Sequence, residues 1–515
     1  MSQKPNIIFI LNDHQAYHGH GRAAGGPEIK RPNFERLASE GVKFTRAYSA
    51  SPLCSPARRS MLTGLYPHNH GEIVNNTNHP WDRETYLNLL AKEGYQNYYF
   101  GKWHAGRGTA YDQHCKGFSY KSYGNPYTKP EYKKYLKRKN LPKFQVRLKE
   151  LFWKPKGFIS RFYGLKKGKK FTPKRPWCNE HAIGPILTPK ETHESFFLAN
   201  LACEKLTELA NEGNSQPFHL RVDFWGPHQP YYATQEYLDL YDPKQIPEYP
   251  SYRDNLEDKP DAYRVDYNYP MSKDHELIVP NPMDWSEWQK ILRYNYAQQS
   301  LIDDAGGLIL NKLDELGLTD ETLVIWSTDH GDGVGCHGGH FDKAWYMPEE
   351  IVRIPMAIRY PKRIDPHQIK KDLVSNMDIP CTILDAAGTQ FNNPVNGCSL
   401  LPLCSNEQID WKGDLMCETH GHISPHLGRL VVTDRYKYVW NEGDLDELYD
   451  LDQDPFEMKN LINSESHISI LEDMKQRLIR WREDTGDVIE RDLIKRKLRG
   501  WSHGLKKKWQ KLRKF

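Results

Sequence analysis

A cysteine, a proline and an arginine are spaced so that they could form a reactive site within one helical turn. Cys54 is followed by Ser55, Pro56 and Arg58. Pro56 fits the first helical position and Ser55 can cap the helix, which would place Cys54 and Arg58 on one face. A guanidinium there would lower the pKa of the thiol and hold an anion. A buried, inert thiol is the alternative for a single cysteine.

Two apolar runs lead to acidic side chains. Residues 6–11 form a nearly continuous apolar run, typical of a strand buried on both faces of a parallel sheet, and Asp13 and His14 follow it. A second apolar run ends in Asp329 and His330. Ligands of open α/β sheets bind at the carboxyl ends of the strands, so these residues could share a metal. A helix cap at Asp13 and a plain Gly-rich loop after Asp329 are the alternatives.

Two further strands lead to basic side chains. Residues 95–100 predict a strand, and Lys102 and His104 alternate just past its end, so both can point to one side. Residues 218–224 predict another strand, which ends in a turn where prolines on both sides aim His228. A packed histidine is the alternative for His104.

The motif Cys-x-Pro-x-Arg followed by Thr63 and Gly64 resembles the signature of type I sulfatases, in the alkaline phosphatase superfamily. The sequences around Lys102, His228 and Asp329 resemble the same family, over nearly the whole chain except a mid-chain insert and the last thirty or so residues. The resemblance implies an α/β fold with a large mixed, mostly parallel sheet flanked by helices. It also implies a smaller C-terminal α+β subdomain on an antiparallel sheet.

The resemblance also implies a modified nucleophile and a metal. In the family the cysteine is oxidised to formylglycine (3-oxoalanine), an aldehyde that is hydrated in the resting enzyme. The hydrated group at Cys54 would attack sulfur, and a divalent metal held by Asp13, Cys54, Asp329 and His330 would lower the pKa of the attacking hydroxyl. His14 stands where the family usually has a second Asp ligand, which makes it a candidate nitrogen ligand. Ca²⁺ is the expected metal, with Mg²⁺ and Mn²⁺ as alternatives.

The remaining residues receive roles in binding sulfate and moving protons, again by resemblance. Arg58, Lys102 and Lys343 would neutralise the sulfate oxygens. His228 or Lys343 would protonate the leaving alcohol. His104 would remove the proton of the second hydroxyl, so that the aldehyde re-forms and sulfate leaves.

The expected function is hydrolysis of a sulfate ester, most plausibly on a carbohydrate, by a protein matured by a formylglycine-generating enzyme. Phosphonate monoester and phosphodiester hydrolases of the same superfamily are one alternative. They share the cysteine motif, tend to lack the second Asp at the first metal strand, and use Asp-His at the later one. A catalytically dead polyanion-binding protein is an alternative of another class.

Length and composition predict a folded globular protein of more than one domain, with 515 residues, 38% of them hydrophobic and 12% aromatic. We expect a catalytic domain at 1–395 with a basic insert at about 129–175, a subdomain at 396–485 and a basic amphipathic tail at 486–515. The fourteen Trp and thirty Tyr suit a surface that stacks on sugar rings. The net charge of +4 gives no general nucleic-acid signal. The insert is either solvated and partly helical or attracts a polyanion. The tail could dock on the protein, be solvated, contact an anionic membrane or bind a polyanion.

The cysteine pattern and the first residues bear on the compartment. Nine cysteines without a Cys-x-x-Cys pair make a structural zinc site unexpected, and the eight besides Cys54 permit disulfides. The first apolar run is too short for a signal peptide, and no run approaches the length of a transmembrane helix. We expect a cytoplasmic protein, or a periplasmic or secreted one if a leader precedes this chain.

Overall fold

The structure is a computed structural model. It describes residues 4–17, 28–120, 125–151, 166–173, 182–213, 216–266, 268, 270–343, 345–422 and 425–488. The predicted tail from residue 489 onward and parts of the predicted basic insert lie outside the described residues. Within the described ranges no helix combines the length and the apolar character needed to cross a membrane. The eight cysteines within them are all free thiols, so none of the disulfides that the sequence permits forms among these eight.

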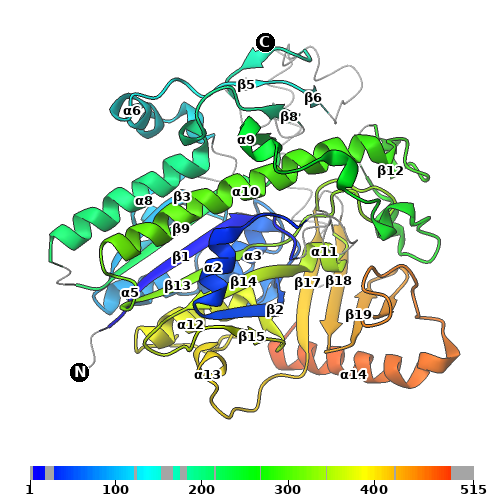
Figure 1. Cartoon of the computed structure of the whole chain (residues 1–515). Helices are drawn as coiled ribbons and strands as arrows, with labels where there is room; N and C mark the ends of the chain where they lie inside the picture. Colours follow the sequence, from blue (N-terminus) through cyan, green and yellow to red (C-terminus); the bar gives the residue numbers. More distant parts are fainter. Residues whose placement is uncertain are drawn as a thin grey trace.

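A nine-stranded mixed sheet forms the centre of the molecule (Figure 1). Its strand order is β15-β2-β14-β13-β1-β9-β3-β4, and β16 also pairs with β2. The strands are β1 (Asn6–Asp13), β2 (Val42–Tyr48), β3 (Gln96–Lys102), β4 (Lys116–Tyr120), β9 (Phe218–Pro227), β13 (Thr322–Thr328), β14 (Arg353–Arg359), β15 (Gln368–Lys370) and β16 (Val374–Ser375). In this sheet β14 runs antiparallel to β13 and β2, and the other pairs are parallel. The predicted mixed, mostly parallel sheet is therefore confirmed.

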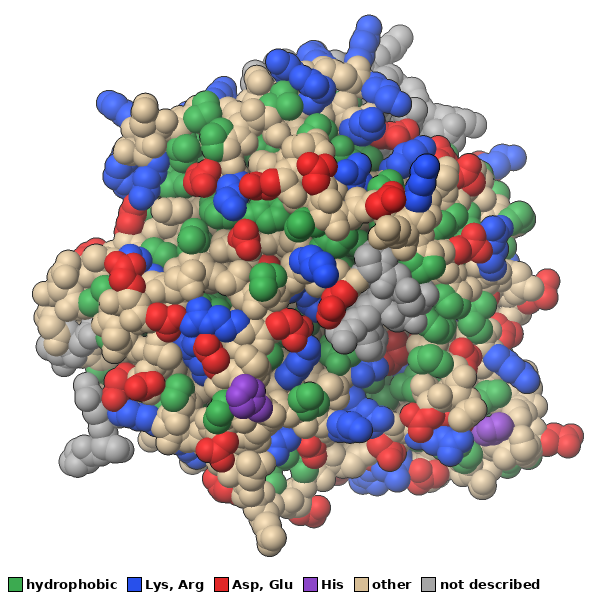
Figure 2. Space-filling view, in the orientation of Figure 1, with side chains coloured by type: hydrophobic (Ala, Val, Ile, Leu, Met, Phe, Trp, Pro, Cys, Tyr) green, Lys and Arg blue, Asp and Glu red, His purple; other side chains and the backbone are tan. Residues whose placement is uncertain are grey.

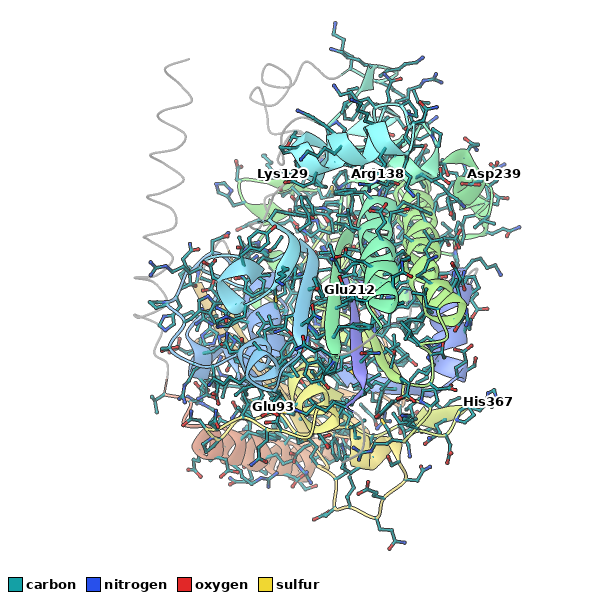
Figure 3. All side chains as sticks on the ribbon, turned by 90° about the vertical axis from the view of Figure 1, so that its left-hand side faces the viewer. Glu93, Lys129, Arg138, Glu212, Asp239 and His367 are labelled. Carbon is teal, nitrogen blue, oxygen red and sulfur yellow. The ribbon has the colours of Figure 1, made fainter. Side chains whose placement is uncertain are left out.

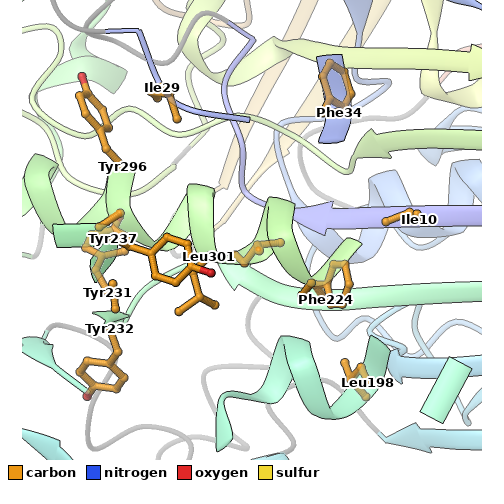
Figure 4. Packing of buried hydrophobic residues seen from close by; sticks show 14 of the residues in the cluster. Ile10, Ile29, Phe34, Leu198, Phe224, Tyr231, Tyr232, Tyr237, Tyr296 and Leu301 are labelled. Atoms are coloured by element: carbon orange, nitrogen blue, oxygen red, sulfur yellow. The ribbon is translucent and has the colours of Figure 1, made fainter. Parts of the chain in front are cut away.

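Helices cover both faces of this sheet, because its central strands carry apolar side chains on both sides. On one face Ile8 and Ile10 of β1 join a core with α2 (Pro32–Ser39), α8 (Glu194–Asn211) and α10 (Trp285–Glu315). Figure 4 shows this packing, with Ile10, Phe34, Leu198 and Phe224 approaching from the strands and helices. On the other face Ile7, Phe9 and Leu11 meet α3 (Cys54–Thr63), α5 (Tyr86–Lys92) and α12 (Ile379–Ala386).

A smaller antiparallel sheet follows in the C-terminal part, as the sequence predicts (Figure 1). It comprises β17 (Leu415–Gly421), β18 (Pro425–Val432), β19 (Tyr436–Asn441) and β20 (Glu447–Asp450), in that order. The helix α14 (Ile468–Thr485) packs on β18 and β19 through Met474 and Leu478. The division of the chain at residue 395 stays a prediction.

The described part of the basic insert extends from the opposite end of the molecule. It contains α6 (Pro130–Arg138), β5 (Val146–Arg147), β6 (Glu150–Leu151) and β7 (Lys170–Phe171). β6 pairs with β8 (Ala182–Pro185), and β8 pairs with β10 (Tyr231–Ala233). Figure 3 shows α6, between the labelled Lys129 and Arg138, at the top of the molecule beyond α8. β5 and β7 form a separate two-stranded sheet, so the described part of the insert contributes to two small sheets and is joined to the main body through β8 and β10.

The segment after β10 contains little regular structure, as the sequence predicts. Its main elements are the short helix α9 (Gln235–Leu238) and the hairpin of β11 (Ser272–Lys273) and β12 (Glu276–Leu277). The long helix α10 begins at Trp285, six residues before the predicted start at residue 291, because Asp284 caps it by accepting from the backbone N–H of Glu287.

A buried histidine joins the loop after β13 to this irregular segment. His337 Nδ1 lies 3.1 Å from Asp254 Oδ2, and His337 Nε2 lies 3.6 Å from Glu350 Oε2. Burial alone would lower the pKa of His337, but the two carboxylates raise it to about 10. His337 is therefore a buried imidazolium that holds two acidic segments together.

We expect His337→Gln to lower the free energy of unfolding by about 3 kcal/mol at pH 6, because it leaves two carboxylates without their cation. A raised folded-state pKa adds stability that is fully present below the unfolded value of 6.5 and is lost as the pH rises through 10. The difference from wild type should therefore shrink toward pH 10. Urea unfolding at pH 6, 8 and 10 measures it, with the exposed His367→Gln as the control. A pH-independent difference would contradict this account.

Candidate active site

Five strands of the central sheet direct their carboxyl ends to the same edge. β13, β1, β9 and β3 are consecutive and parallel, and β2 has the same direction because β14 is antiparallel to both β13 and β2. The chemically active residues at these ends are Asp13 in β1, Cys54 after β2, Lys102 in β3, His228 after β9, and Asp329 with His330 after β13. The predicted strand-end positions therefore lie together at one edge of the sheet.

Cys54 is the first residue of α3 rather than a residue before the helix. Leu53 occupies the N-cap position, so the predicted cap at Ser55 and the predicted helix start at Pro56 are wrong. Ser55 Oγ instead donates to Glu72 Oε1 at 2.9 Å, which removes it from capping. The cysteine thus lies at the positive end of the helix dipole, with its side chain fully buried.

Arg58 faces three carboxylates, and not the thiol. Its Nε donates to Asp329 at 2.9 Å, its Nη1 to Asp223 at 2.8 Å and its Nη2 to Asp13 at 2.5 Å. The predicted lowering of the Cys54 pKa is therefore not observed. Burial raises the pKa of that thiol to about 12, and Lys343 and Lys102 oppose the rise only in part. The guanidinium fork instead fixes the acidic side chains relative to one another.

Four side chains form a group with the chemistry of a metal site. The ligand atoms of Asp13, Cys54, Asp329 and His330 all lie within 4.8 Å of one another, and all four residues are buried. His330 Nδ1–H donates to the carbonyl of Gly331 at 2.8 Å, so its Nε2 carries a lone pair, 3.0 Å from Cys54 Sγ. Asp13 Oδ1 is buried without a hydrogen-bond partner among the described residues. An orphaned carboxylate oxygen and an aimed imidazole nitrogen fit a divalent metal.

His14 lies at the edge of this group. Together with Asp13 and His228 it forms a second set of close ligand atoms, and its Nε2 lies 3.2 Å from Asp342 Oδ1 and 3.4 Å from Asp332 Oδ1. Burial and Lys343 hold the pKa of His14 well below its ordinary value. His14 therefore stands as a neutral imidazole between the metal-type group and the carboxylates.

Lys102 and His104 flank the same group. Lys102 Nζ lies 2.6 Å from Asp13 Oδ2 and 4.6 Å from the centre of the Trp225 ring. Gly101, at φ +121°, allows the end of β3 to lie close to β9, because a Cβ there would lie 2.0 Å from the carbonyl oxygen of Asp223. Burial, with Lys102 nearby, holds the pKa of His104 well below its ordinary value. The site thus pairs a cation with a neutral base.

His228 and Lys343 form a second pair of this kind. His228 Nδ1–H donates to the carbonyl of Gln229 at 2.9 Å, which leaves Nε2 as an acceptor 3.5 Å from Lys343 Nζ. Lys343 Nζ also lies 3.1 Å from Asp342 Oδ1. Burial and Lys343 keep the pKa of His228 well below its ordinary value. The ammonium group of Lys343 therefore lies beside an unprotonated ring nitrogen of His228.

The sequence reasoning missed four residues of this site. Asp223 accepts from Arg58 and from Tyr99 Oη, and Trp225 lies over Lys102. Asp332 and Asp342 both face His14. The signal that could have been read was the series His219, Arg221 and Asp223 within a buried strand, since buried charges need partners.

Fold and site together define a hydrolase that acts on esters of a tetrahedral oxyanion, with a nucleophile position, a metal-type group and two lysines. The chain matches the family model described as Sulfatase over residues 5–389, and the model described as N-sulphoglucosamine sulphohydrolase, C-terminal, over residues 335–484. Because the first match covers well over half of the chain, this protein belongs to the sulfatase family, whose members hydrolyse sulfate esters.

Individual relatives are similar over most of their length. An N-acetylglucosamine-6-O-sulfatase of Bacteroides thetaiotaomicron is 26% identical, over 93% of this chain and 86% of its own. A solved structure of a protein in complex with its substrate D-glucosamine-2-N,6-O-disulfate has a TM-score of 0.69 at 22% identity, covering 95% of this chain and 99% of its own. A phosphonate monoester hydrolase from Silicibacter pomeroyi has a TM-score of 0.72 at 21% identity, covering 94% and 96%. The two structures show that the fold is shared.

Proposed function

We propose that this chain hydrolyses a sulfate ester of a carbohydrate, through a formylglycine made from Cys54. The observation that carries the proposal is the buried cluster of Cys54, Asp13, Asp329 and His330. Two lysines flank this cluster. A thiol whose pKa burial raises to about 12 is a poor nucleophile at neutral pH. The hydrated aldehyde would offer an oxygen nucleophile at the same place, which supports conversion by a formylglycine-generating enzyme.

The metal would be held by Asp13, Asp329, His330 and the group derived from Cys54. A divalent cation there would supply Lewis-acid polarisation and lower the pKa of the attacking hydroxyl. The imidazole nitrogen of His330 suits Mn²⁺ better than Ca²⁺, which prefers oxygen ligands. The donor set therefore favours Mn²⁺ over the expected Ca²⁺. Arg58 supports the set by fixing both carboxylates.

The two lysines would bind the sulfate group. Lys102 and Lys343 stand on opposite flanks, one against Asp13 and the other against His228. In a site closed to water their charges stabilise the negative charge that develops on the oxygens during S–O cleavage. Arg58 already donates to three carboxylates, so we assign it to positioning rather than to sulfate binding.

Protons would move through the two histidines with lowered pKa values. His228 would receive a proton from Lys343 and donate it to the oxygen of the leaving alcohol. His104 is neutral at physiological pH and would accept the proton of the second hydroxyl, so that the aldehyde re-forms. The two histidines would therefore serve different steps, His228 the cleavage and His104 the release of sulfate.

The sugar part of the substrate is supported by the relatives and by Trp225. The named relative acts on N-acetylglucosamine 6-O-sulfate, and the complex contains a disulfated glucosamine. Trp225 is half-buried, and its ring centre lies 5.3 Å from that of His228. An indole that is partly exposed beside Lys102 and His228 suits the apolar face of a sugar ring.

We expect kcat/KM for an aryl sulfate to exceed that for the matching aryl phosphonate monoester, on protein co-produced with a formylglycine-generating enzyme. Both esters carry a single negative charge, but the sulfate offers three non-bridging oxygens to Lys102 and Lys343, whereas the phosphonate offers two and a carbon substituent. Steady-state kinetics on both substrates at one pH measure the ratio. A ratio below one would favour phosphonate or phosphodiester hydrolysis, a function that His14 in place of a second Asp supports.

A further inference from the structure

Six exposed cations gather on one small hairpin of the insert. We name as the basic hairpin the residues 146–149 and 166–171, which contain β5 and β7. Its cations are Arg147, Lys149, Lys166, Lys167, Lys169 and Lys170. Figure 2 shows Lys and Arg side chains along the upper margin of the molecule, where Figure 1 places α6 and β5. Glu150 and other carboxylates of the described residues form no ion pair with Arg147, Lys149 or Lys170.

The hairpin holds like charges directly opposite each other. β5 and β7 are antiparallel, with Arg147 paired to Lys170 and Val146 paired to Phe171. The N–H of Leu148 donates to the carbonyl of Lys169 at 2.9 Å, which fixes the register. Like charges in directly opposed positions destabilise a strand pair. An anionic ligand would remove this penalty, so the arrangement itself points to one.

The apolar side of the hairpin anchors it to the strand that follows the catalytic turn. Val146 and Leu148 are buried, while Arg147 and Lys149 between and after them are exposed, as alternation requires. The Phe171 ring meets the Tyr232 ring with centres 6.2 Å apart. Tyr232 lies in β10, which begins three residues after His228. The cations are thus displayed on a scaffold that is joined to the active-site turn.

From these observations we infer that the basic hairpin binds a sulfated polysaccharide, which would be the substrate of this enzyme. The inference rests on the proposed function. A chain with many sulfate groups presents anions to several cations at once, and a field of one sign raises the local concentration of such a substrate. The guanidinium of Arg147 can bind two sulfate oxygens in parallel.

Two other polyanions fit the hairpin less well. Binding of single-stranded nucleic acid uses exposed aromatic rings, but Tyr132, Tyr135 and Phe144, in the described part of the insert, are buried. Membrane-surface segments combine basic residues with apolar ones that enter the lipid. The large hydrophobic side chains that are exposed in the described structure all lie outside residues 125–151 and 166–173. Within these described ranges the cations have no exposed large apolar neighbours, which favours a hydrated, sulfated chain.

The test is the affinity for dextran sulfate of the full chain and of the variant R147S/K149S/K167S/K170S. We expect the variant to bind dextran sulfate about tenfold more weakly at 50 mM salt. Each cation that is removed lowers the number of counterions that the polyanion releases on binding. The control R83S/K92S/K116S/K371S removes the same charge from exposed positions elsewhere and should bind within about twofold of wild type. Both variants should keep kcat/KM for a small aryl sulfate, because none of these residues lies in the active site.

The outcomes separate this inference from the proposed function. Binding is measured without turnover, so an inactive protein that still prefers dextran sulfate over dextran would support the hairpin and sink the sulfatase proposal. Equal losses in both variants would show a net-charge effect and overturn the inference. Tighter binding to single-stranded RNA or to phosphatidylserine vesicles than to dextran sulfate would overturn it as well, and would name the other partner.

Discussion

Replacing Cys54 by alanine is expected to lower kcat for an aryl sulfate by a factor on the order of ten thousand or more, because the residue supplies the reacting oxygen after conversion to formylglycine. KM should be measured beside kcat, since Lys102 and Lys343 remain to bind the sulfate. The free energy of unfolding should change little, because the alanine keeps the helix start at this position. Near-normal turnover would exclude Cys54 as the nucleophile precursor.

A matched control separates loss of the nucleophile from loss of a buried thiol. Cys404 is also fully buried, in the hydrophobic core that α12 joins, and Cys404→Ala should retain activity. Mass spectrometry of the peptide that contains Cys54 gives an independent readout. Protein co-produced with the maturation enzyme should show the mass of an aldehyde in place of the thiol, and an unmodified thiol in fully active protein would contradict the proposed chemistry.

Replacing Arg58 by methionine is expected to destabilise the fold by about 3–5 kcal/mol, because three buried carboxylates lose their shared cation. Burial raises the pKa of Asp13, but Lys102 and Arg58 hold it well below 3.8. A lowered carboxyl pKa adds stability that is present above the unfolded value and is lost as the pH falls through the folded value. The deficit of the variant should therefore be largest near neutral pH and should narrow below about pH 4.

Urea unfolding in the presence of a chelator measures this deficit without help from bound metal. The free energy of unfolding of Arg58→Lys should lie between those of wild type and Arg58→Met. An ammonium group keeps the charge but lacks the planar, forked donors that reach three carboxylates. The control is Arg477→Met, which removes an arginine that bonds Asp414 and Asp473 at the surface and should cost much less. Equal costs at both positions would show that the buried network adds nothing.

Much of the fold could be predicted because buried parallel strands leave a local pattern. The apolar runs before Asp13 and Asp329 predict strands that the structure confirms as neighbours, β1 and β13. Short-range capping was harder to predict. The sequence near Cys54 offers Ser55 as a cap, yet Glu72 takes its hydroxyl, and no local pattern shows a partner seventeen residues away.

The sequence by itself determined which residues are available for chemistry and that the strand ends bring them to one edge, since parallel strands of one sheet end on the same side. Only the tertiary structure decided which charge meets which. Arg58 reaches Asp223, which lies 165 residues further along the chain, and Asp329, which lies 271 residues further. The strength of a Coulomb interaction depends on the distance between the charges and on their burial. Both are set only when the strands and helices have packed together.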